Sequence, residues 1–274
     1  MSLSVKNTFG GGGNPEGLYV WKKHNYIDVG VDIVPWAYGT DDQIAAMVNA
    51  ADNGLIKLSD FWSVGDERKV TLSAMPATGV GESHARQTVT FVLMNVGGKF
   101  LARDTPSGRS KCSFIVGLKN GLAEQGYMNS SDTNSGGWES CARRTWCNTV
   151  FRNAIPSTLR GIFKQHRNHT GTGTGTSFVI STDYFALPAE KEVFGQNSSA
   201  NSTAEANLRQ FKYYQTDRNI IKKDGDSSLY SLISWWERSP SQISASYFSS
   251  VRFGTDTGSD SASTANLLAP FGCI

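Results

Sequence analysis

The chain has 274 residues, of which 39% are hydrophobic and 11% aromatic, enough for one substantial core and a smaller appendage. Lys and Arg number 26 against 24 for Asp and Glu, and no basic cluster is interleaved with aromatic residues. We therefore expect no nucleic-acid partner. No apolar stretch of signal-peptide length follows Met1, and no apolar run approaches a membrane span, which predicts cytoplasmic synthesis and no membrane insertion.

The first 55 residues are predicted to form a flexible lead and a small attachment region. Residues 1–16 include the run Phe9-Gly10-Gly11-Gly12-Gly13, which cannot hold regular structure and predicts a flexible lead. Strand composition follows at residues 18–21 and 29–34, and Thr40 opens a helix with a capping box to Gln43. The apolar face of this helix comprises Ile44, Met47, Val48 and Ala51, and Asn53-Gly54 ends it. We expect residues 17–55 to form a small α+β region.

From residue 56 onward, short strands alternate with glycine-rich turns and two helices. The first helix is expected from about Ser140 to before Pro156, burying Ala142, Trp146 and Val150 at four-residue spacing. The second begins at Pro156 and buries Leu159, Ile162 and Phe163. Strands are expected at 69–74, 87–96, 112–116, 178–180, 184–187 and within 267–274, a loop at 167–176, and a short helix at 188–195.

The cysteines and histidines give no pattern of a metal or cofactor site. Cys112, Cys141, Cys147 and Cys273 match no zinc spacing, and six residues place Cys141 and Cys147 on different faces of a helix, which predicts packed thiols. His166 and His169 form an HxxH beside a glycine-rich stretch without a third ligand, which favours solvated loop residues over a metal site. Ser83 and His84 are adjacent in sequence, and adjacent side chains seldom face each other as a nucleophile and base must. We expect no cofactor.

A set of ordered motifs resembles a bacterial and phage family of C-type-lectin-like domains. Residues 136–148 (GGWESCARRTWCN) are similar to the family's GGW-x-S-x-x-R-x-W-L-N helix. The family's further motifs match IPSTL (155–159), STDYFAL (181–187), EVFG (192–195), WWERSP (235–240) and APFGCI (269–274), all in order. Glu237 departs from the family's usual Leu, and Leu268-Ala269 departs from its frequent Val-Arg, which puts local detail in doubt.

The resemblance implies an α+β, C-type-lectin-like domain over residues 56–274, with short twisted antiparallel strands, two helices and long loops. This family is similar to the sulfatase-modifying-factor branch of the fold and includes variable proteins of diversity-generating retroelements. The core motif it implies consists of Trp138, Arg144, Trp146, Trp235, Trp236 and Arg238. From the residues themselves we expect at least one of Trp235 and Trp236 to anchor the core. Arg143, Arg144, Glu237 and Arg238 either form a buried network or are solvated charges.

Residues 241–266 are the expected binding segment. They contain eight serines with a few aromatic and arginine residues and almost no aliphatic content, a mixture typical of antibody-like binding loops, although an ordinary polar surface loop has a similar composition. In the resembling family, the segment between the motifs that match WWERSP and APFGCI presents the variable face. The candidate ligand-binding residues are Ser241, Gln242, Ser244, Ser246, Tyr247, Phe248, Ser250, Arg252, Phe253, Thr255, Asp256, Asp260 and Asn266.

These observations predict a non-catalytic binding protein of a phage or prophage particle, on a tail, fibre or head decoration. Its expected partners are a host-surface protein or glycan and other phage structural subunits, and the sequence leaves self-association into a homo-oligomer open. The expected location is the virion. A structural decoration protein without an external ligand is the alternative. An oxidase of the sulfatase-modifying kind, using Cys273 with Cys112, is a further alternative, but no motif around these cysteines supports it.

Overall fold

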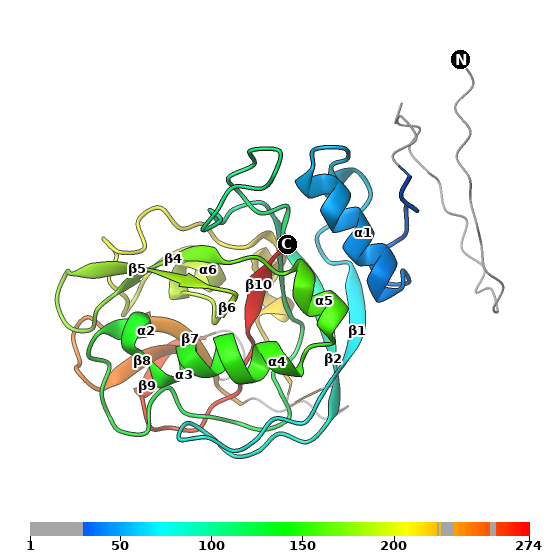
Figure 1. Ribbon diagram of the computed structural model, residues 1–274. Coiled ribbons are helices and arrows are strands. Elements are labelled where there is room, and N and C mark those ends of the chain that lie inside the picture. Colours follow the sequence, from blue (N-terminus) through cyan, green and yellow to red (C-terminus); the bar gives the residue numbers. More distant parts are fainter. Residues whose placement is uncertain (1–29, 224, 226–232, 253–255) are drawn as a thin grey trace.

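The computed structural model describes residues 30–223, 225, 233–252 and 256–274, which form a mixed α+β fold with three antiparallel sheets (Figure 1). The largest sheet has the order β1-β2-β3-β10-β6, and two smaller sheets contain β4-β5 and β7-β8-β9. The expected α+β class with antiparallel strands is therefore confirmed. The lead at 1–16 and the strand at 18–21 lie outside the described residues.

The five-stranded sheet forms the apolar core. Its strands are β1 (Glu67–Leu72), β2 (Gln87–Val96), β3 (Phe114–Leu118), β10 (Phe271–Cys273) and β6 (Phe185–Ala186). The expected strand at 87–96 is confirmed in its bounds, and β3 begins two residues later than expected. The C-terminal strand β10 pairs with both β3 and β6, so the end of the chain is buried within the sheet.

Helix α1 (Asp41–Asp52) covers one end of this sheet. Thr40 and Gln43 form the expected capping box. Ile44 and Met47 are buried in the same hydrophobic cluster as the sheet, and α1 packs against α5 (Ser157–Ile162). The strand expected at 29–34 is wrong for residues 30–34, because side chains bind this segment instead: Trp62 Nε1 donates to the Val34 carbonyl at 2.9 Å.

The helix expected from Ser140 is divided into four short pieces. They are α2 (Gly137–Ser140), α3 (Ala142–Trp146), a π-helical turn (Cys147–Phe151) and α4 (Arg152–Ala154). Cys141 adopts an extended conformation between α2 and α3, which shifts the buried face. The expected burial of Ala142 is therefore wrong: Ala142 is exposed, and Val150 is only half-buried. In α3 and the π-helical turn, the buried residues are Arg143, Trp146, Cys147 and Phe151.

Two glycines fix the position of α2. Gly136 and Gly137 both have positive φ, and a Cβ at Gly137 would lie 1.9 Å from the Gly171 carbonyl oxygen. This close approach lets the start of α2 lie against β4 (His166–Gly171). The GG pair before Trp138 is therefore required by backbone packing as well as by the left-handed conformation.

Residues 167–171 form a strand rather than the expected loop. β4 pairs with β5 (Phe178–Asp183) along its whole length, and its inward positions are polar: His166, Asn168 and Thr170 are buried. Polar inward residues hide the usual alternation of strand hydrophobicity, which explains the wrong expectation. His166, expected to be solvated, is buried with its ring centroid 5.2 Å from that of Phe271, and burial lowers its pKa to about 4.

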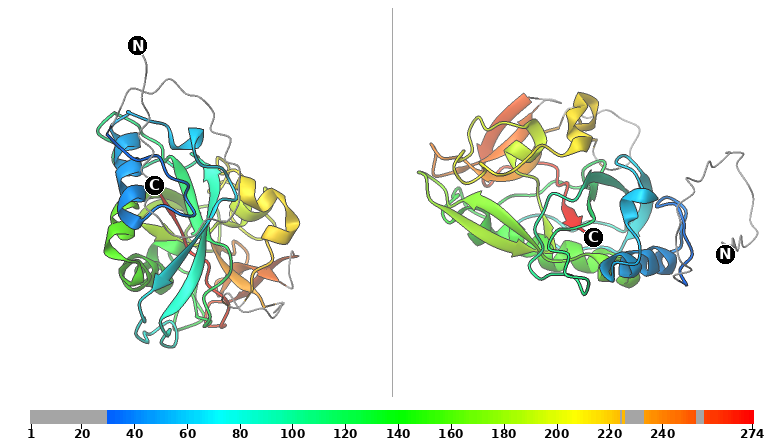
Figure 2. Two further views of the ribbon diagram at one scale, coloured as in Figure 1. Left: turned by 90° about the vertical axis from the view of Figure 1, so that its right-hand side faces the viewer. Right: turned by 90° about the horizontal axis from the view of Figure 1, so that it is seen from above.

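The rest of the chain carries the smaller elements. α6 (Glu190–Phe194) ends on Gly195 in the left-handed conformation, as expected. The three-stranded sheet consists of β7 (Trp235–Pro240), β8 (Tyr247–Arg252) and β9 (Asp256–Ser261). Short 3-10 helices lie at Leu58–Asp60, Lys212–Gln215 and Asp217–Asn219. Figure 2 shows that β4-β5 and β7-β8-β9 lie at the end of the molecule away from α1.

Candidate ligand-binding surface

The expected binding segment folds into a hairpin whose strand β8 is buried from Phe248 to Val251, whereas Tyr247 and β9 are exposed or half-buried. β8 and β9 pair in register from Tyr247 opposite Ser261 to Arg252 opposite Asp256. Phe248 and Val251 are buried in the main hydrophobic cluster, so the hairpin is fixed to the core. Because β7 and the middle of β8 are buried on both faces, the three-stranded sheet gives the segment a stable base despite its serine content.

The structure divides the expected ligand-binding residues into two groups. Ser241, Phe248, Ser250 and Asn266 are buried, so the expectation that their side chains face a ligand is wrong. Phe253 and Thr255 lie outside the described residues. The exposed or half-buried members are Gln242, Ser244, Ser246, Tyr247, Arg252, Asp256 and Asp260. Among the described residues, Ile243, which the composition argument passed over, is the most exposed large apolar side chain, at 85%.

Asn134 holds the turn at residues 241–247 from beneath. Its buried side-chain amide donates to the carbonyls of Ser241, Ser244 and Tyr247 at 3.0, 2.7 and 2.8 Å. Its own backbone N–H donates to the Ala245 carbonyl at 2.8 Å. Sequence reasoning missed Asn134, because its partners lie more than a hundred residues away and no local signal marks it. The turn therefore has a fixed backbone, while the side chains of Ile243 and Tyr247 are exposed.

Two carboxylates brace the hairpin. Asp260 accepts hydrogen bonds from Ser250 at 2.7 Å and Asn266 at 2.9 Å, and it pairs with Arg252. Although burial opposes it, these contacts lower the pKa of Asp260. At the surface, Asp132 accepts from the hydroxyls of Ser261 and Ser263, and these hydrogen bonds lower its pKa. Both acids are ionised at neutral pH, and both bind the hairpin to itself or to the neighbouring loop.

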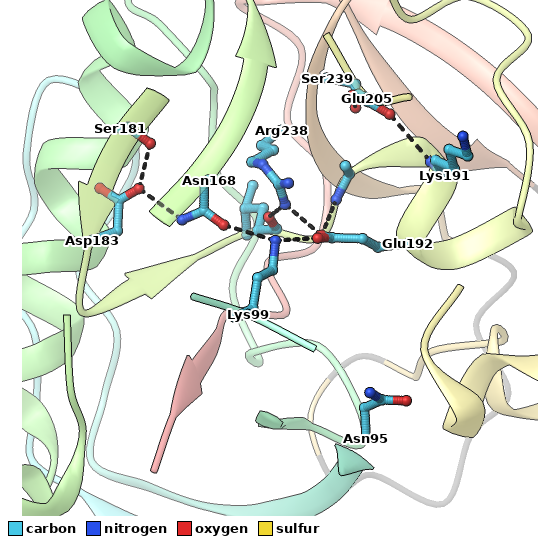
Figure 3. A network of polar contacts seen from close by, with 12 residues as sticks. Asn95, Lys99, Asn168, Ser181, Asp183, Lys191, Glu192, Glu205, Arg238 and Ser239 are labelled. Atoms are coloured by element: carbon cyan, nitrogen blue, oxygen red, sulfur yellow. Dashed lines mark hydrogen bonds and ion pairs between the residues drawn. The ribbon is translucent and has the colours of Figure 1, made fainter. Parts of the chain in front are cut away.

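A buried charged cluster lies behind the surface (Figure 3). Glu192 contacts Lys99 and also Arg238, at 2.5 Å, and these two cations overcome the burial that would raise its pKa and bring it to about 2. Lys99 also donates to Asn168 at 3.0 Å, and Asn168 donates to Asp183 at 2.9 Å. The cluster links β4, β5, α6 and β7, and its charged groups are closed to solvent.

The core-motif residues divide between this cluster and the packing around it. Trp138 and Arg144 both contact Asp183, at 3.1 and 2.6 Å. Trp235 and Trp236 are both buried and donate to the carbonyls of Ile220 and Gly126, which confirms the expected anchoring. Trp146 is buried and stacks on Phe151.

The four expected network members do not bind one another as a single network. Arg143 donates to the Val80 and Tyr127 carbonyls, whereas Arg144 binds Asp183 and Arg238 binds Glu192. Glu237 is fully buried, and within the described residues its carboxyl oxygens make no hydrogen bond. Burial, together with the neighbouring Glu190 and Glu205, raises the pKa of Glu237 well above its ordinary value.

All four cysteines are buried free thiols. Burial raises the pKa of Cys141 to about 11, and it raises the pKa of Cys147 and of Cys273 far above the ordinary thiol value. The Cys112 thiol hydrogen-bonds with Cys273, and this contact lowers the pKa of Cys112. The structure thus brings together the pair that an oxidase would use, but it places both thiols where solvent does not reach them.

A hollow of about 350 Å³ lies beside the base of the hairpin. Its lining consists of Gly81, Glu82, Ala123, Glu124, Gln125, Tyr127 and Ala265. Next to Glu124, the buried His84 lies 2.9 Å from its carboxylate and contacts the Trp146 ring at 5.5 Å between centroids, and burial lowers the pKa of His84. Within the residues that the structure describes, no group of three or more acidic, His or Cys side chains could hold a metal ion. In the same part of the chain, no helix is long and apolar enough to cross a membrane.

One family model matches the chain, and its description is "Domain of unknown function (DUF6273)". The match covers residues 113–267, from just before β3 to just before β10, and so includes the hairpin and the members of the charged cluster other than Lys99. No curated protein and no solved structure matches the chain.

Proposed function

The chain belongs to the DUF6273 family of domains of unknown function, and we propose that it is a non-catalytic binding protein of a phage or prophage particle. In this proposal, residues 241–261 recognise a host-surface protein or glycan. The observation that carries it is the turn at 241–247, whose backbone is held by Asn134 while Ile243 and Tyr247 project into solvent, with 85% and 41% of their surfaces exposed.

The physical argument is one of preorganisation. A fixed backbone loses little conformational freedom when a ligand binds, so apolar and aromatic side chains on it contribute more of their contact energy to affinity. Ile243 and Tyr247 are surrounded by the polar side chains of Gln242, Ser244 and Ser246, which adapt their hydrogen bonds to different partners. An exposed apolar pair with a polar rim is the usual composition of a recognition site.

The finer fold assignment is part of the same proposal. We assign the domain to the C-type-lectin-like class, supported by its ordered sequence motifs, its short antiparallel strands and its C-terminal strand paired inside the main sheet. Placement on a phage particle, and diversification of residues 241–266 by a retroelement, rest on that sequence resemblance. The buried thiols favour binding without chemistry over the oxidase alternative.

The test is binding of the purified full chain to a panel of bacterial cells and to an array of bacterial-surface glycans. We expect the parent to bind and the double variant Ile243→Ala, Tyr247→Ala to lose roughly tenfold or more in affinity, as truncation of two central contacts does. The matched control is Tyr38→Ala, Leu55→Ala, which removes exposed side chains elsewhere (71% and 51%) and should bind like the parent.

Two results would contradict the proposal. Equal losses in the two double variants would show that recognition does not depend on residues 241–247. Absence of binding by all three proteins across the panel would favour the alternative, a decoration protein whose hairpin is buried against other particle subunits. Unchanged melting temperatures are required for either comparison, since both variants alter surface positions only.

A further inference from the structure

The β4-β5 ribbon exposes an apolar face at one end of the molecule (Figures 1 and 2). Phe178 and Ile180 alternate along β5 and are 51% and 47% exposed. On β4, His169 lies opposite Ile180 and stacks on the Phe178 ring at 6.3 Å, and the exposed Arg167 lies opposite Thr182. This face therefore consists of two large apolar side chains flanked by an imidazole and a guanidinium.

The backbone of β5 also has an unpaired edge. Thr172 donates to the Ser177 carbonyl at 3.1 Å, and the alternation of the antiparallel ladder then directs the N–H and C=O groups of Phe178, Ile180 and Thr182 away from β4. The Thr182 carbonyl accepts from Arg144 at 3.2 Å. Among the described residues, the backbone N–H and C=O groups of Phe178 and Ile180 have no backbone partner.

Two other outer strands, β1 and β9, carry features that usually prevent edge pairing, and β5 does not. β1 has Glu67 and Lys69 at exposed positions, and β9 has Gly258 between Asp256 and Asp260. Charges, glycine and proline on edge strands prevent association between sheets. Residues 178–182 (FVIST) contain none of these and combine high strand propensity with zero charge.

We propose that β5 pairs with β5 of a second copy of this chain, in an antiparallel arrangement centred on Ile180. This register places Ile180 opposite Ile180 of the second copy and Phe178 opposite Thr182 of the second copy. The outward N–H and C=O groups of Phe178 and Ile180 in both copies then gain partners, and the two ribbons join into one four-stranded sheet.

The charge distribution favours a second copy of this chain as the partner of the β5 edge. Residues 178–182 carry no charge, so the two-fold arrangement brings no like charges together along the new ladder. Arg167 stands beside Thr182, and the register brings it toward the Phe178 ring of the second copy. Stacking of a cation on a ring recurs in this chain, with Lys111 over Phe100 at 4.8 Å and Arg152 over Tyr184 at 3.9 Å.

Such pairing would place two candidate binding surfaces in one assembly. The loop that joins β4 to β5 contacts the turn at 241–247, since the Gly175 N–H donates to the Gln242 carbonyl at 3.1 Å. Two linked surfaces raise the avidity for a repeated ligand such as a cell-surface polymer. The dimer itself does not depend on the proposed function, because its test needs no ligand.

The first experiment measures the mass of the full chain in solution by light scattering across a concentration series. We expect the parent to shift from monomer to dimer as concentration rises, and Ile180→Lys to remain monomeric throughout. Val96→Lys is the matched control, because Val96 is 51% exposed on β2 and lies outside the ribbon. A monomeric parent at every concentration, or an Ile180→Lys variant that dimerises like the parent, would overturn the proposal.

The second experiment tests the register and does not depend on a destabilising charge. All four native cysteines are buried, so Ile180→Cys introduces an accessible thiol on the ribbon. Directly paired residues across a strand pair have Cβ atoms about 5 Å apart, within reach of a short bis-maleimide. We expect a cross-linked dimer from Ile180→Cys and none from Leu55→Cys. A dimer that Ile180→Cys does not cross-link would rule out pairing centred on this residue.

Discussion

β2 and β3 bury aliphatic and aromatic side chains, whereas β4, β7 and β8 bury histidine, asparagine, glutamate, arginine and serine. The five-stranded sheet is therefore held by nonspecific apolar packing, which tolerates substitutions of similar volume. The three-stranded sheet also packs Trp235, Trp236, Phe248 and Val251 into the core, and the smaller sheets add directional contacts, such as Glu192 with Lys99 and Arg238.

This difference suits a binding surface built from small polar residues. A serine-rich hairpin cannot bury enough apolar area to order itself, so directional contacts from beneath must fix its backbone. Asn134 and Asp260 supply such contacts and leave Ile243 and Tyr247 outside them. The outward side chains can then vary without loss of the fold, which is what a diversified recognition surface requires.

The largest expected effect comes from breaking the charged cluster. Arg238→Met removes one cation from Glu192 and leaves a buried carboxylate with Lys99 alone. Breaking a buried pair costs about 3–5 kcal/mol. Chemical denaturation should show this loss for Arg238→Met and about 2–5 kcal/mol for Leu93→Ala in β2. A loss below about 1 kcal/mol for Arg238→Met would show that the cluster does not hold the smaller sheets.

Asn134→Ala tests whether directional contacts also hold the turn at residues 241–247. It leaves the buried carbonyl of Ser241 and its neighbours without their donor, and unsatisfied buried groups cost about 1–3 kcal/mol. Hydrogen exchange should show loss of protection in residues 241–247 while β2 and β3 stay protected. The exposed Asn49→Ala is the control and should leave both unchanged. Equal loss of protection everywhere would mean that the turn is not a separable unit.

Glu237→Leu should act in the opposite direction. The buried Glu237 carboxyl has no hydrogen bond within the described residues, and Leu has a similar volume. Removing an unsatisfied polar group should stabilise the protein by about 1–3 kcal/mol. Because the folded-state pKa of Glu237 is raised, the parent loses stability as pH rises above the ordinary carboxyl value. The gain in stability from Glu237→Leu should therefore be larger at pH 7 than at pH 4. An equal gain at the two pH values would contradict the raised pKa of Glu237.

Sequence patterns predicted the elements whose apolar periodicity is regular. The capping box of α1, the bounds of β2 and the glycine end of α6 all follow from local residues. β4 was expected as a loop because its buried positions are polar, and their partners, such as Lys99, lie far away in sequence. The break at Cys141 has no local signal either.

At the candidate site, composition identified the segment but not the side that each residue faces. Sequence placed both Tyr247 and Phe248 at the ligand, whereas the hairpin turns them to opposite sides. The period of two along a strand was available, but the turn that sets its phase is held by Asn134, over a hundred residues earlier. Long-range hydrogen bonds therefore decide which half of the segment can meet a ligand.

The smallest expected effect tests most directly whether Tyr247 and Phe248 face opposite sides of the strand. Tyr247→Ser should change the free energy of unfolding by no more than about 0.5 kcal/mol, because the ring is 41% exposed and its backbone carbonyl, which Asn134 binds, is retained. Phe248→Ser, one residue later, removes a ring with no exposed surface and should cost about 3–5 kcal/mol. Denaturant titrations of the two variants measure the difference directly. Similar costs at both positions would mean that the outward side of the hairpin also stabilises the fold, and such a surface could not be diversified without destabilising the protein.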